Sequence, residues 1–296
     1  MVSPKVISPQ FLLWSQSLLL WSVAAYGVAA DPLREETARI RWTRWMLLLA
    51  PRAILTVGFG YFLSRSIALS SFLGLTILIQ PLLRYRMSMR MIAEFESLWI
   101  AAFMVGGLAV IRYFYLVPRW IPGPISPAQL SALCIFASTL FVVVRGGTYI
   151  VRGILRKSDT LPSGRRPSDS LEPSTASSLL PETPETPSLI TSIAASTDEP
   201  VHTGVDAKEY NRGRLIGNLE RIVLTIVVAA GSYAALAFLV AAKGVVRSDE
   251  FDRNRDFAEY FLIGSLSSVL VALCAGIALR FALIRLWPDL LSLQIQ

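Results

Sequence analysis

The sequence has few of the side chains that enzymes most often use for chemistry. Its 296 residues include one histidine, His202, and two cysteines, Cys134 and Cys274. A single histidine excludes an H-E-x-x-H zinc site, and its position in a segment rich in serine, threonine and proline argues against Ser–His or Cys–His catalysis. The cysteines lie far apart, each within an apolar run, so we expect two small buried hydrophobic residues and no disulfide.

Other common signatures are also missing. The chain has no G-x-x-x-x-G-K-[ST] loop to hold nucleotide phosphates. No aspartate falls within the long apolar runs, so an Asp-held Mg²⁺ site lacks its ligands there. The sequence therefore predicts no enzymatic activity, no cofactor and no metal site.

Charge is scarce as well. Charged residues make up 17% of the chain and hydrophobic residues 53%, with a mean hydropathy of +0.53. Soluble domains carry about 25% charged residues. This composition excludes an ordinary cytosolic enzyme, a disulfide-stapled secreted domain and a disordered regulator. It predicts an all-α polytopic membrane protein whose surroundings are the lipid bilayer.

About 20 apolar residues cross a bilayer as a helix. By this measure we expect about seven transmembrane helices, in a group of five and then a group of two. They are Phe11–Ala30, Met46–Leu63, Ile67–Leu83, Leu98–Val117, Gln129–Val151, Ile216–Ala242 and Phe257–Leu283.

Two regions leave this count open. Pro51 and Arg52 interrupt the second run, so six or eight helices are alternatives. The short break at residues 64–66 fits either a tight helical hairpin or a re-entrant segment. The first run also has some features of a signal peptide, although we favour a retained helix.

The composition divides the chain into three parts. Residues 1–157 form the N-terminal membrane region with about five helices, and residues 212–296 form a C-terminal helical hairpin. Between them, about half of residues 158–203 are serine, threonine or proline. Such a segment buries too little apolar surface to fold. We therefore predict a disordered linker over residues 158–211, most simply a spacer, with phosphorylation or partner binding as the alternative.

The net charge of +7 is unevenly distributed. Residues 1–150 carry 13 Lys and Arg against 5 Asp and Glu, whereas residues 216–296 carry 7 of each. The excess lies in short clusters between apolar runs, as expected where cytoplasmic Lys and Arg set the orientation. We expect the N-terminus outside, the linker and the C-terminus in the cytoplasm, and no nucleic-acid partner.

The last two predicted helices carry the most informative pattern. Gly213 and Gly217 form a G-x-x-x-G pair on the first of them, and Gly264 belongs to a stripe of small residues on the second. Small residues let helices approach closely within a membrane. We expect a tightly packed antiparallel hairpin, with possible contact between copies of the chain or with another membrane protein.

Charged residues lie near the ends of the same two helices: Glu220 and Arg221, then Lys243 and Arg247, then Glu259. In one interpretation they are structural, with Glu259 paired to Lys243 or Arg247, and Glu220 paired to a neighbouring arginine. In the other they serve transport or binding, because ionisable groups at membrane depth are functional candidates.

The stretch Gly213–Ser268 resembles the C-terminal signature of an uncharacterised bacterial family, domain of unknown function 3307. The matching positions are Gly213, Ile216, Gly217, Leu219, Glu220, Arg221, Ala241, Ala242, Lys243, Arg247, Glu259, Tyr260, Leu262 and Gly264. The N-terminal half does not match, because the family has His and Asp residues there, whereas residues 1–150 contain no histidine and only Asp31. The resemblance implies a bacterial inner-membrane protein and supplies no reaction.

Two functions remain open from the sequence. The first is a non-enzymatic scaffold or assembly component with a tightly packed C-terminal hairpin. The alternative is a transporter of small solutes or ions that uses the charged residues at the ends of the last two helices.

Overall fold

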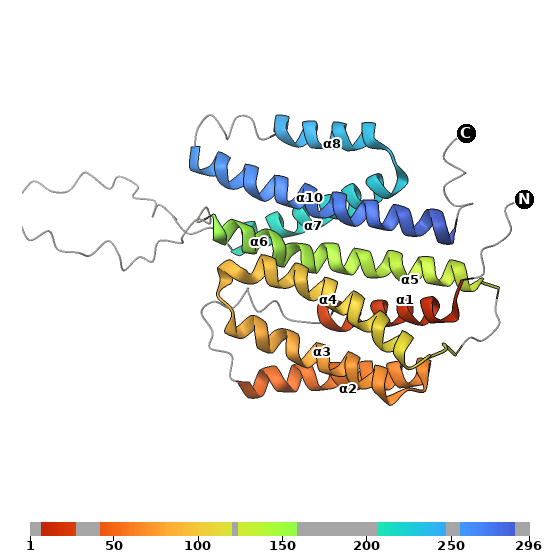
Figure 1. Ribbon diagram of the computed structural model, residues 1–296. Coiled ribbons are helices and arrows are strands. Elements are labelled where there is room, and N and C mark those ends of the chain that lie inside the picture. The colour runs from red at the N-terminus through yellow and green to blue at the C-terminus, as the bar shows by residue number, and fades with distance from the viewer. Residues whose placement is uncertain (1–6, 28–41, 120–123, 159–206, 247–254, 288–296) are drawn as a thin grey trace, which may run out of the picture. The chain divides into compact units, whose positions relative to one another are not determined.

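The computed structural model describes residues 7–27, 42–119, 124–158, 207–246 and 255–287 (Figure 1). Over these ranges every regular element is helical and none is a strand, which confirms the all-α fold class. The chain separates into two compact units: residues 162–215 form one, and Met1–Leu161 together with Ile216–Gln296 form the other. The larger unit contains every side chain discussed below.

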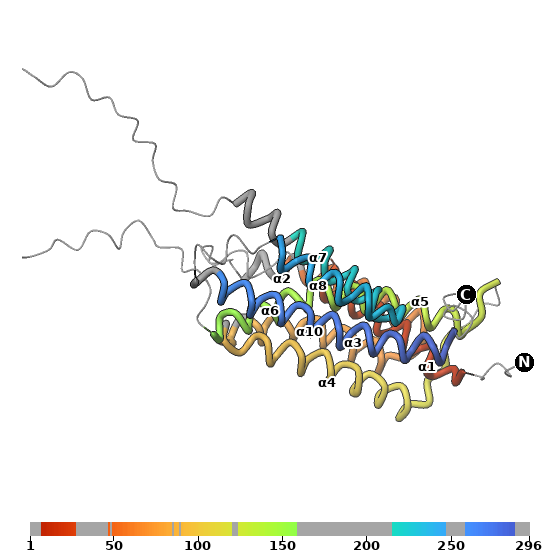
Figure 2. The backbone as a smooth tube through the Cα atoms, turned by 90° about the horizontal axis from the view of Figure 1, so that it is seen from above, coloured from red at the N-terminus to blue at the C-terminus, as the bar shows by residue number. Residues whose placement is uncertain are grey.

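The first half forms a bundle of roughly antiparallel helices, which Figures 1 and 2 show from two directions. Its elements are α1 (Pro9–Ser22), η1 (Val23–Gly27), α2 (Trp42–Ser64), α3 (Ile67–Arg86), η3 (Met89–Met91), α4 (Ile92–Tyr113), α5 (Pro127–Phe141), η4 (Val142–Gly146) and α6 (Gly147–Lys157). Here η1 and η4 are π-helical turns that continue α1 and α5, and η3 is a 3₁₀ turn. The second half contributes α7 (Ala207–Ala230), α8 (Tyr233–Val246) and α10 (Arg255–Leu286).

Serine side chains define three of the helix starts. Ser8, Ser66 and Ser126 each accept a hydrogen bond from the backbone N–H three residues later, at the starts of α1, α3 and α5. Gln129 completes a capping box with Ser126. Between α2 and α3, Arg65 adopts a left-handed conformation with φ of 54°. The break at residues 64–66 is therefore a tight turn between two helices, which fits both alternatives left open by the sequence.

The interior has two apolar clusters. The larger one joins α1, α3 and α4 and is centred on fully buried side chains that include Leu13, Trp21, Leu73 and Phe103. The indole of Trp21 stacks on Phe103 with ring centroids 4.4 Å apart. The smaller cluster joins α5, α7 and α10 through Ala132, Ile135, Ala229, Leu279 and Leu283.

Four helical segments of the described chain are long and apolar enough to cross a membrane: Ile67–Arg84, Ile92–Tyr113, Pro127–Lys157 and Ala258–Leu286. Shorter apolar helices cover Leu49–Ser64 and Tyr233–Val246. Every predicted apolar run thus contains helix, but helix length and composition single out four segments and not seven.

The predicted single helix Ile216–Ala242 is wrong. The chain instead forms α7 and α8, which meet at Gly231 with φ of +80°, and α8 runs back in the opposite direction (Figure 1). A left-handed residue cannot continue an α-helix, and glycine adopts this conformation without steric cost.

This reversal changes the end of the bundle at which α10 finishes. Phe11 and Trp14, near the start of α1, pack around the same apolar cluster as Leu283 and Trp287, at the end of α10. The first and last described helices therefore have their outer ends at the same end of the bundle (Figure 1). The expected arrangement of seven crossings would place those ends opposite each other.

The C-terminal boundary of the predicted linker also shifts. Residues 159–206 lie outside the described residues, whereas α7 already begins at Ala207, so residues 207–211 are helical. In the other direction α6 extends to Lys157, beyond the predicted end of the apolar run at Val151.

Candidate functional site

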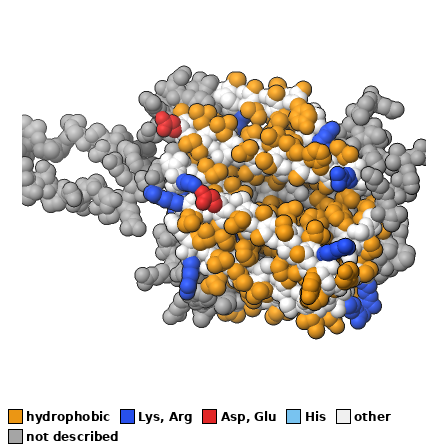
Figure 3. All heavy atoms as spheres, viewed as in Figure 1, with side chains coloured by type: hydrophobic (Ala, Val, Ile, Leu, Met, Phe, Trp, Pro, Cys, Tyr) orange, Lys and Arg blue, Asp and Glu red, His pale blue; other side chains and the backbone are white. Residues whose placement is uncertain are grey.

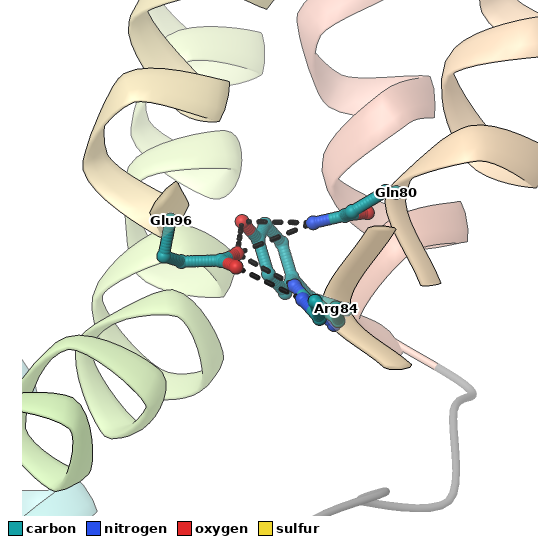
Figure 4. A network of polar contacts seen from close by, with 4 residues as sticks. Gln80, Arg84 and Glu96 are labelled. Carbon is teal, nitrogen blue, oxygen red and sulfur yellow. Dashed lines mark hydrogen bonds and ion pairs between the residues drawn. The ribbon is translucent and has the colours of Figure 1, made fainter. Parts of the chain in front are cut away.

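The most distinctive site is a buried polar network between α3, α4 and η1. Gln80 and Arg84 lie one helical turn apart on α3 and so share a face, and Glu96 lies in the second turn of α4. In Figure 4 their side chains converge from the two helices on a single carboxylate. The phenol of Tyr26, from η1, completes the network.

Glu96 is the centre of this network. Arg84 donates to it twice, from Nε to Oε2 at 2.9 Å and from Nη2 to Oε1 at 2.6 Å. Gln80 Nε2 donates to Oε1 at 3.2 Å, and the Tyr26 hydroxyl also donates to this oxygen. The side chains of Arg84 and Glu96 are 6% and 0% exposed. A planar guanidinium that donates through two parallel bonds is the strongest and most directional form of such a pair.

Aromatic rings enclose the arginine. The Arg84 guanidinium carbon lies 4.0 Å from the centre of the Tyr149 ring on α6 and 5.7 Å from that of Tyr26. Gly146, in η4, lies against Tyr26, since a Cβ there would be in ordinary van der Waals contact, 3.5 Å from the Tyr26 hydroxyl. Two π-helical turns therefore meet at this site, and such turns are frequent at functional positions.

The carboxylate of Glu96 is surrounded by its partners. It accepts hydrogen bonds from three side chains and is wholly buried. Among the described residues no group of three or more His, Cys, Asp or Glu side chains is placed to hold a metal ion. The arrangement joins α3, α4 and η1 through hydrogen bonds, and Tyr149 adds a contact from α6.

A second buried arginine lies on the other side of α6. Arg221, on α7, is 5% exposed, and its Nη2 donates to Thr148 Oγ1 at 2.9 Å and to Asn218 Oδ1 at 2.6 Å. Its Nε is buried and has no hydrogen-bond partner. The side chain lies against Gly147, where a Cβ would be 3.4 Å from Arg221 Cδ.

The structure joins only some of the residues singled out from the sequence. Lys243 forms an ion pair with Glu220, and their side chains are 25% and 31% exposed. The sequence suggested Glu259 as the partner of Lys243 or Arg247, and a neighbouring arginine as the partner of Glu220. The structure pairs Glu220 with Lys243, between α7 and α8, because the chain reverses at Gly231. Arg247 lies outside the described residues, and only the helical backbone of Gly213 is described.

The glycines singled out from the sequence are not the positions where the last helices approach each other most closely. At Gly217 nothing lies within 4 Å of where a Cβ would be, so no helix of the described chain approaches it closely. Gly264 faces Leu155 of α6 at ordinary van der Waals distance, 3.6 Å, and Tyr260, one turn earlier on α10, is half-buried. The close approach occurs at Gly276, where a Cβ would lie 2.6 Å from Val228 of α7.

Arg280 holds the break between α7 and α8. Its Nη1 donates to the carbonyl of Ala229 at 3.4 Å, and a Cβ on Gly231 would overlap its guanidinium. The last carbonyls of a helix lack partners within the helix and carry partial negative charge. A cation from α10 at this position therefore stabilises the end of α7.

The central network was not predicted from the sequence. The apolar run was predicted to begin at Leu98, which left Glu96 outside the helix, and Arg84 counted only as an orientation signal. The sequence held one signal: Arg84 directly follows one apolar run, and Glu96 comes just before the next. Because a short connection joins the two runs, both residues lie at the same end of two neighbouring helices.

No protein-family model matches this chain, and no curated protein or solved structure matches it either.

Proposed function

We propose that this chain is a non-enzymatic integral membrane protein that acts as a scaffold or assembly component. Four long apolar helices support membrane insertion. Hydrophobic side chains also cover most of the face in Figure 3, with charged groups toward its two edges. Soluble monomers rarely expose apolar patches larger than a few hundred Å². The resemblance to the uncharacterised bacterial family, and with it an inner-membrane location, stays a prediction.

One observation carries the scaffold proposal: the wholly buried carboxylate of Glu96 is enclosed by its own hydrogen-bond partners. Glu96 is wholly buried and accepts from Tyr26, Gln80 and Arg84. Transport requires a charged group that changes partners or that the solute can reach, and the buried Glu96 carboxylate meets neither condition in this arrangement. A network that joins four segments and reaches no solvent serves to hold a fixed shape.

The charge distribution supports one orientation. The end of the bundle where α3 and α6 finish carries Arg84 and Arg86, then Arg156 and Lys157. We place this end in the cytoplasm, in accordance with the excess of Lys and Arg in cytoplasmic loops. The start of α1 then faces outside, as expected, but so does the end of α10. Seven apolar segments are retained in this proposal, with the sixth reversing at Gly231.

The assembly role is tested at Gly217. Because nothing lies within 4 Å of a Cβ there, Gly217→Leu should leave the fold of a single chain unchanged. If this face contacts a partner, the variant should run at a smaller native mass in mild detergent. Gly58→Leu on α2 is the matched control, since a Cβ at Gly58 also meets nothing. Wild type, Gly217→Leu and Gly58→Leu all running as monomers of equal stability would refute assembly through this face.

A transporter remains the alternative because of the partly exposed pair of Glu220 and Lys243. It lies on a helix that is interrupted at Gly231, and interrupted helices line the ion and substrate sites of many transporters. In proteoliposomes, flux of a transported solute should fall in Glu220→Gln and remain in Glu94→Gln, whose carboxylate lies in an exposed pair with Lys157. Flux equal to that of empty liposomes over a broad panel of ions and small solutes would exclude this alternative.

A further inference from the structure

The hairpin of α7 and α8 is short for a membrane crossing. Helix α8 has 14 residues, which at 1.5 Å per residue is about 21 Å, whereas the hydrocarbon core of a bilayer is about 30 Å thick. Apolar helices of this length are usually either buried in a protein core or re-entrant. The first option does not apply to α8, because none of its residues is buried.

The turn of this hairpin lies below the outer end of the bundle. Gly231, at the turn, lies against the guanidinium of Arg280, whose Nη1 donates to the carbonyl of Ala229. Beyond Arg280, α10 continues to Leu286, a further distance of about 9 Å. Figures 1 and 2 show the same relation, since the turn stops short of the ends of α5 and α10.

The hairpin of α2 and α3 provides a comparison within the same chain. Its turn has the same local form, a left-handed residue followed by a serine, with Arg65 in the place of Gly231. The carbonyl of Leu63, however, accepts a hydrogen bond from the backbone N–H of Arg119, which follows the end of α4. The first hairpin therefore reaches the end of a neighbouring helix, whereas the second stops before it.

A turn at this depth needs polar surroundings. Helix ends leave backbone groups without intrahelical partners, and in a bilayer such groups are tolerated only where protein or water surrounds them. The described part of the chain does not cover the turn, because Ser232 and Ala234 are exposed and Tyr233 is 54% exposed. Arg280 satisfies the carbonyl of Ala229, but it also brings a charge to the same depth, where a charge requires water or a counter-ion.

We propose that α7 and α8 form a re-entrant hairpin whose turn, with Arg280 beside it, faces water in a depression on the outer side of the membrane. Small polar solutes can enter this depression, and the guanidinium favours anions over cations among them. Neither α8 nor the part of α10 after Glu259 contains an acidic residue that would offset this charge. The proposal rests on the membrane insertion and orientation proposed above, and its test separates the two.

The test is cysteine labelling of the full chain in bacterial spheroplasts, after Cys134 and Cys274 are replaced by alanine. A small membrane-impermeant methanethiosulfonate and a bulky polyethylene-glycol maleimide are added from outside. The variants are Ser232→Cys in the turn, Ile125→Cys before α5, Leu270→Cys on the exposed apolar face of α10, and Ser88→Cys between α3 and η3.

We expect Ile125→Cys to react with both reagents and Ser232→Cys to react with the small one only, with the bulky reagent slower by roughly tenfold or more. Leu270→Cys should react with neither, because the thiolate is the reactive form and does not persist in lipid. The proposal is wrong if Ser232→Cys is as unreactive as Leu270→Cys, if it reacts only after permeabilisation, or if it takes the bulky reagent as readily as Ile125→Cys. Ser88→Cys should react only after permeabilisation, and labelling of this variant from outside would overturn the membrane orientation itself.

The preference for anions is measured at the same cysteine. The ratio of the rates with an anionic and a cationic methanethiosulfonate, divided by that of Ile125→Cys, should exceed one for Ser232→Cys. Adding Arg280→Gln should lower this ratio severalfold, whereas Arg280→Lys, which keeps the charge, should preserve it. Arg112→Gln, which removes an exposed arginine at the end of α4, is the matched control and should leave it unchanged. A ratio that is the same with and without Arg280 would refute the role of its charge.

Discussion

The strongest prediction concerns Glu96, because its removal leaves a buried cation without a counter-ion. In Glu96→Gln the side chain keeps its size but loses its charge, while Arg84 stays 6% exposed between two aromatic rings. Breaking a buried ion pair by removing one partner costs about 3–5 kcal/mol. At about 1.4 kcal/mol for each factor of ten, the ratio of folded to unfolded protein should fall by a factor of roughly 10² to several thousand.

The same helix supplies the control. Glu94 lies on α4 two residues before Glu96 and forms an ion pair with Lys157, but both side chains are about 60% exposed. Exposed pairs contribute about 0–1 kcal/mol. Glu94→Gln should therefore change stability by no more than about 1 kcal/mol, although it makes the same chemical change.

A double variant separates the loss of a pair from the loss of a charge. In Arg84→Met with Glu96→Leu, no unpaired ion remains, and replacing a buried pair by apolar side chains is often neutral. Tyr26 and Gln80 then lose their acceptor, at about 1–3 kcal/mol each. The double variant should nevertheless be more stable than Arg84→Met alone, whose buried carboxylate keeps its charge without its partner.

The measurement is a reversible denaturant titration in detergent micelles, followed by tryptophan fluorescence. Trp21 stacks on Phe103 within the cluster next to the network, so its emission reports on this region. If Glu96→Gln is as stable as Glu94→Gln to within about 1 kcal/mol, the buried ion pair of Arg84 and Glu96 does not stabilise the fold.

Three further substitutions follow from the packing. Gly153→Ala places a Cβ that overlaps the backbone of Ala93 where α6 crosses the start of α4, so we expect a loss of about 1–3 kcal/mol in the same titration. Gly231→Ala forces an alanine into the left-handed conformation, which costs about 1–2 kcal/mol of stability, and its Cβ also displaces Arg280. Adding Arg280→Ala should recover only the part of the lost stability that is due to this overlap. Full recovery would contradict the role of the backbone conformation. Arg84→Lys keeps the charge but loses the paired donors, so its stability should lie between the wild type and Glu96→Gln, as judged by the titration midpoint.

The apolar segments could be predicted from the sequence because hydropathy over a window of 20 residues is a local property. Their ends could not be placed as well. The helix that contains Glu96 begins at Ile92, six residues before the predicted start at Leu98. The sequence of those residues does not distinguish a buried acid from an exposed one. Only the packing of the neighbouring helices decides that Glu96 pairs with the buried Arg84 and that Glu94 forms an exposed pair with Lys157.

The reversal at Gly231 illustrates a different limit. Gly231 and Ser232 form a Gly/Ser pair, which signals at most a kink and is compatible with a continuous transmembrane helix. The decisive contact comes from Arg280, whose guanidinium reaches the carbonyl of Ala229 across 51 residues of sequence. The pairing of Glu220 with Lys243 then follows from the reversal, so the error in the helix and the error in the ion pair have one cause.

Helix α6 contacts the two buried arginines through successive residues. The Tyr149 ring lies 4.0 Å from the guanidinium carbon of Arg84, and Thr148 accepts a hydrogen bond from Arg221. Side chains on two successive residues of a helix point in directions about 100° apart, so the two arginines meet different faces of α6. The carboxylate that pairs with Arg84 comes from α4, whereas Arg221 donates to Thr148 of α6 and to Asn218 of its own helix. Helix α6 thus lies between two buried cations that have separate sets of polar partners.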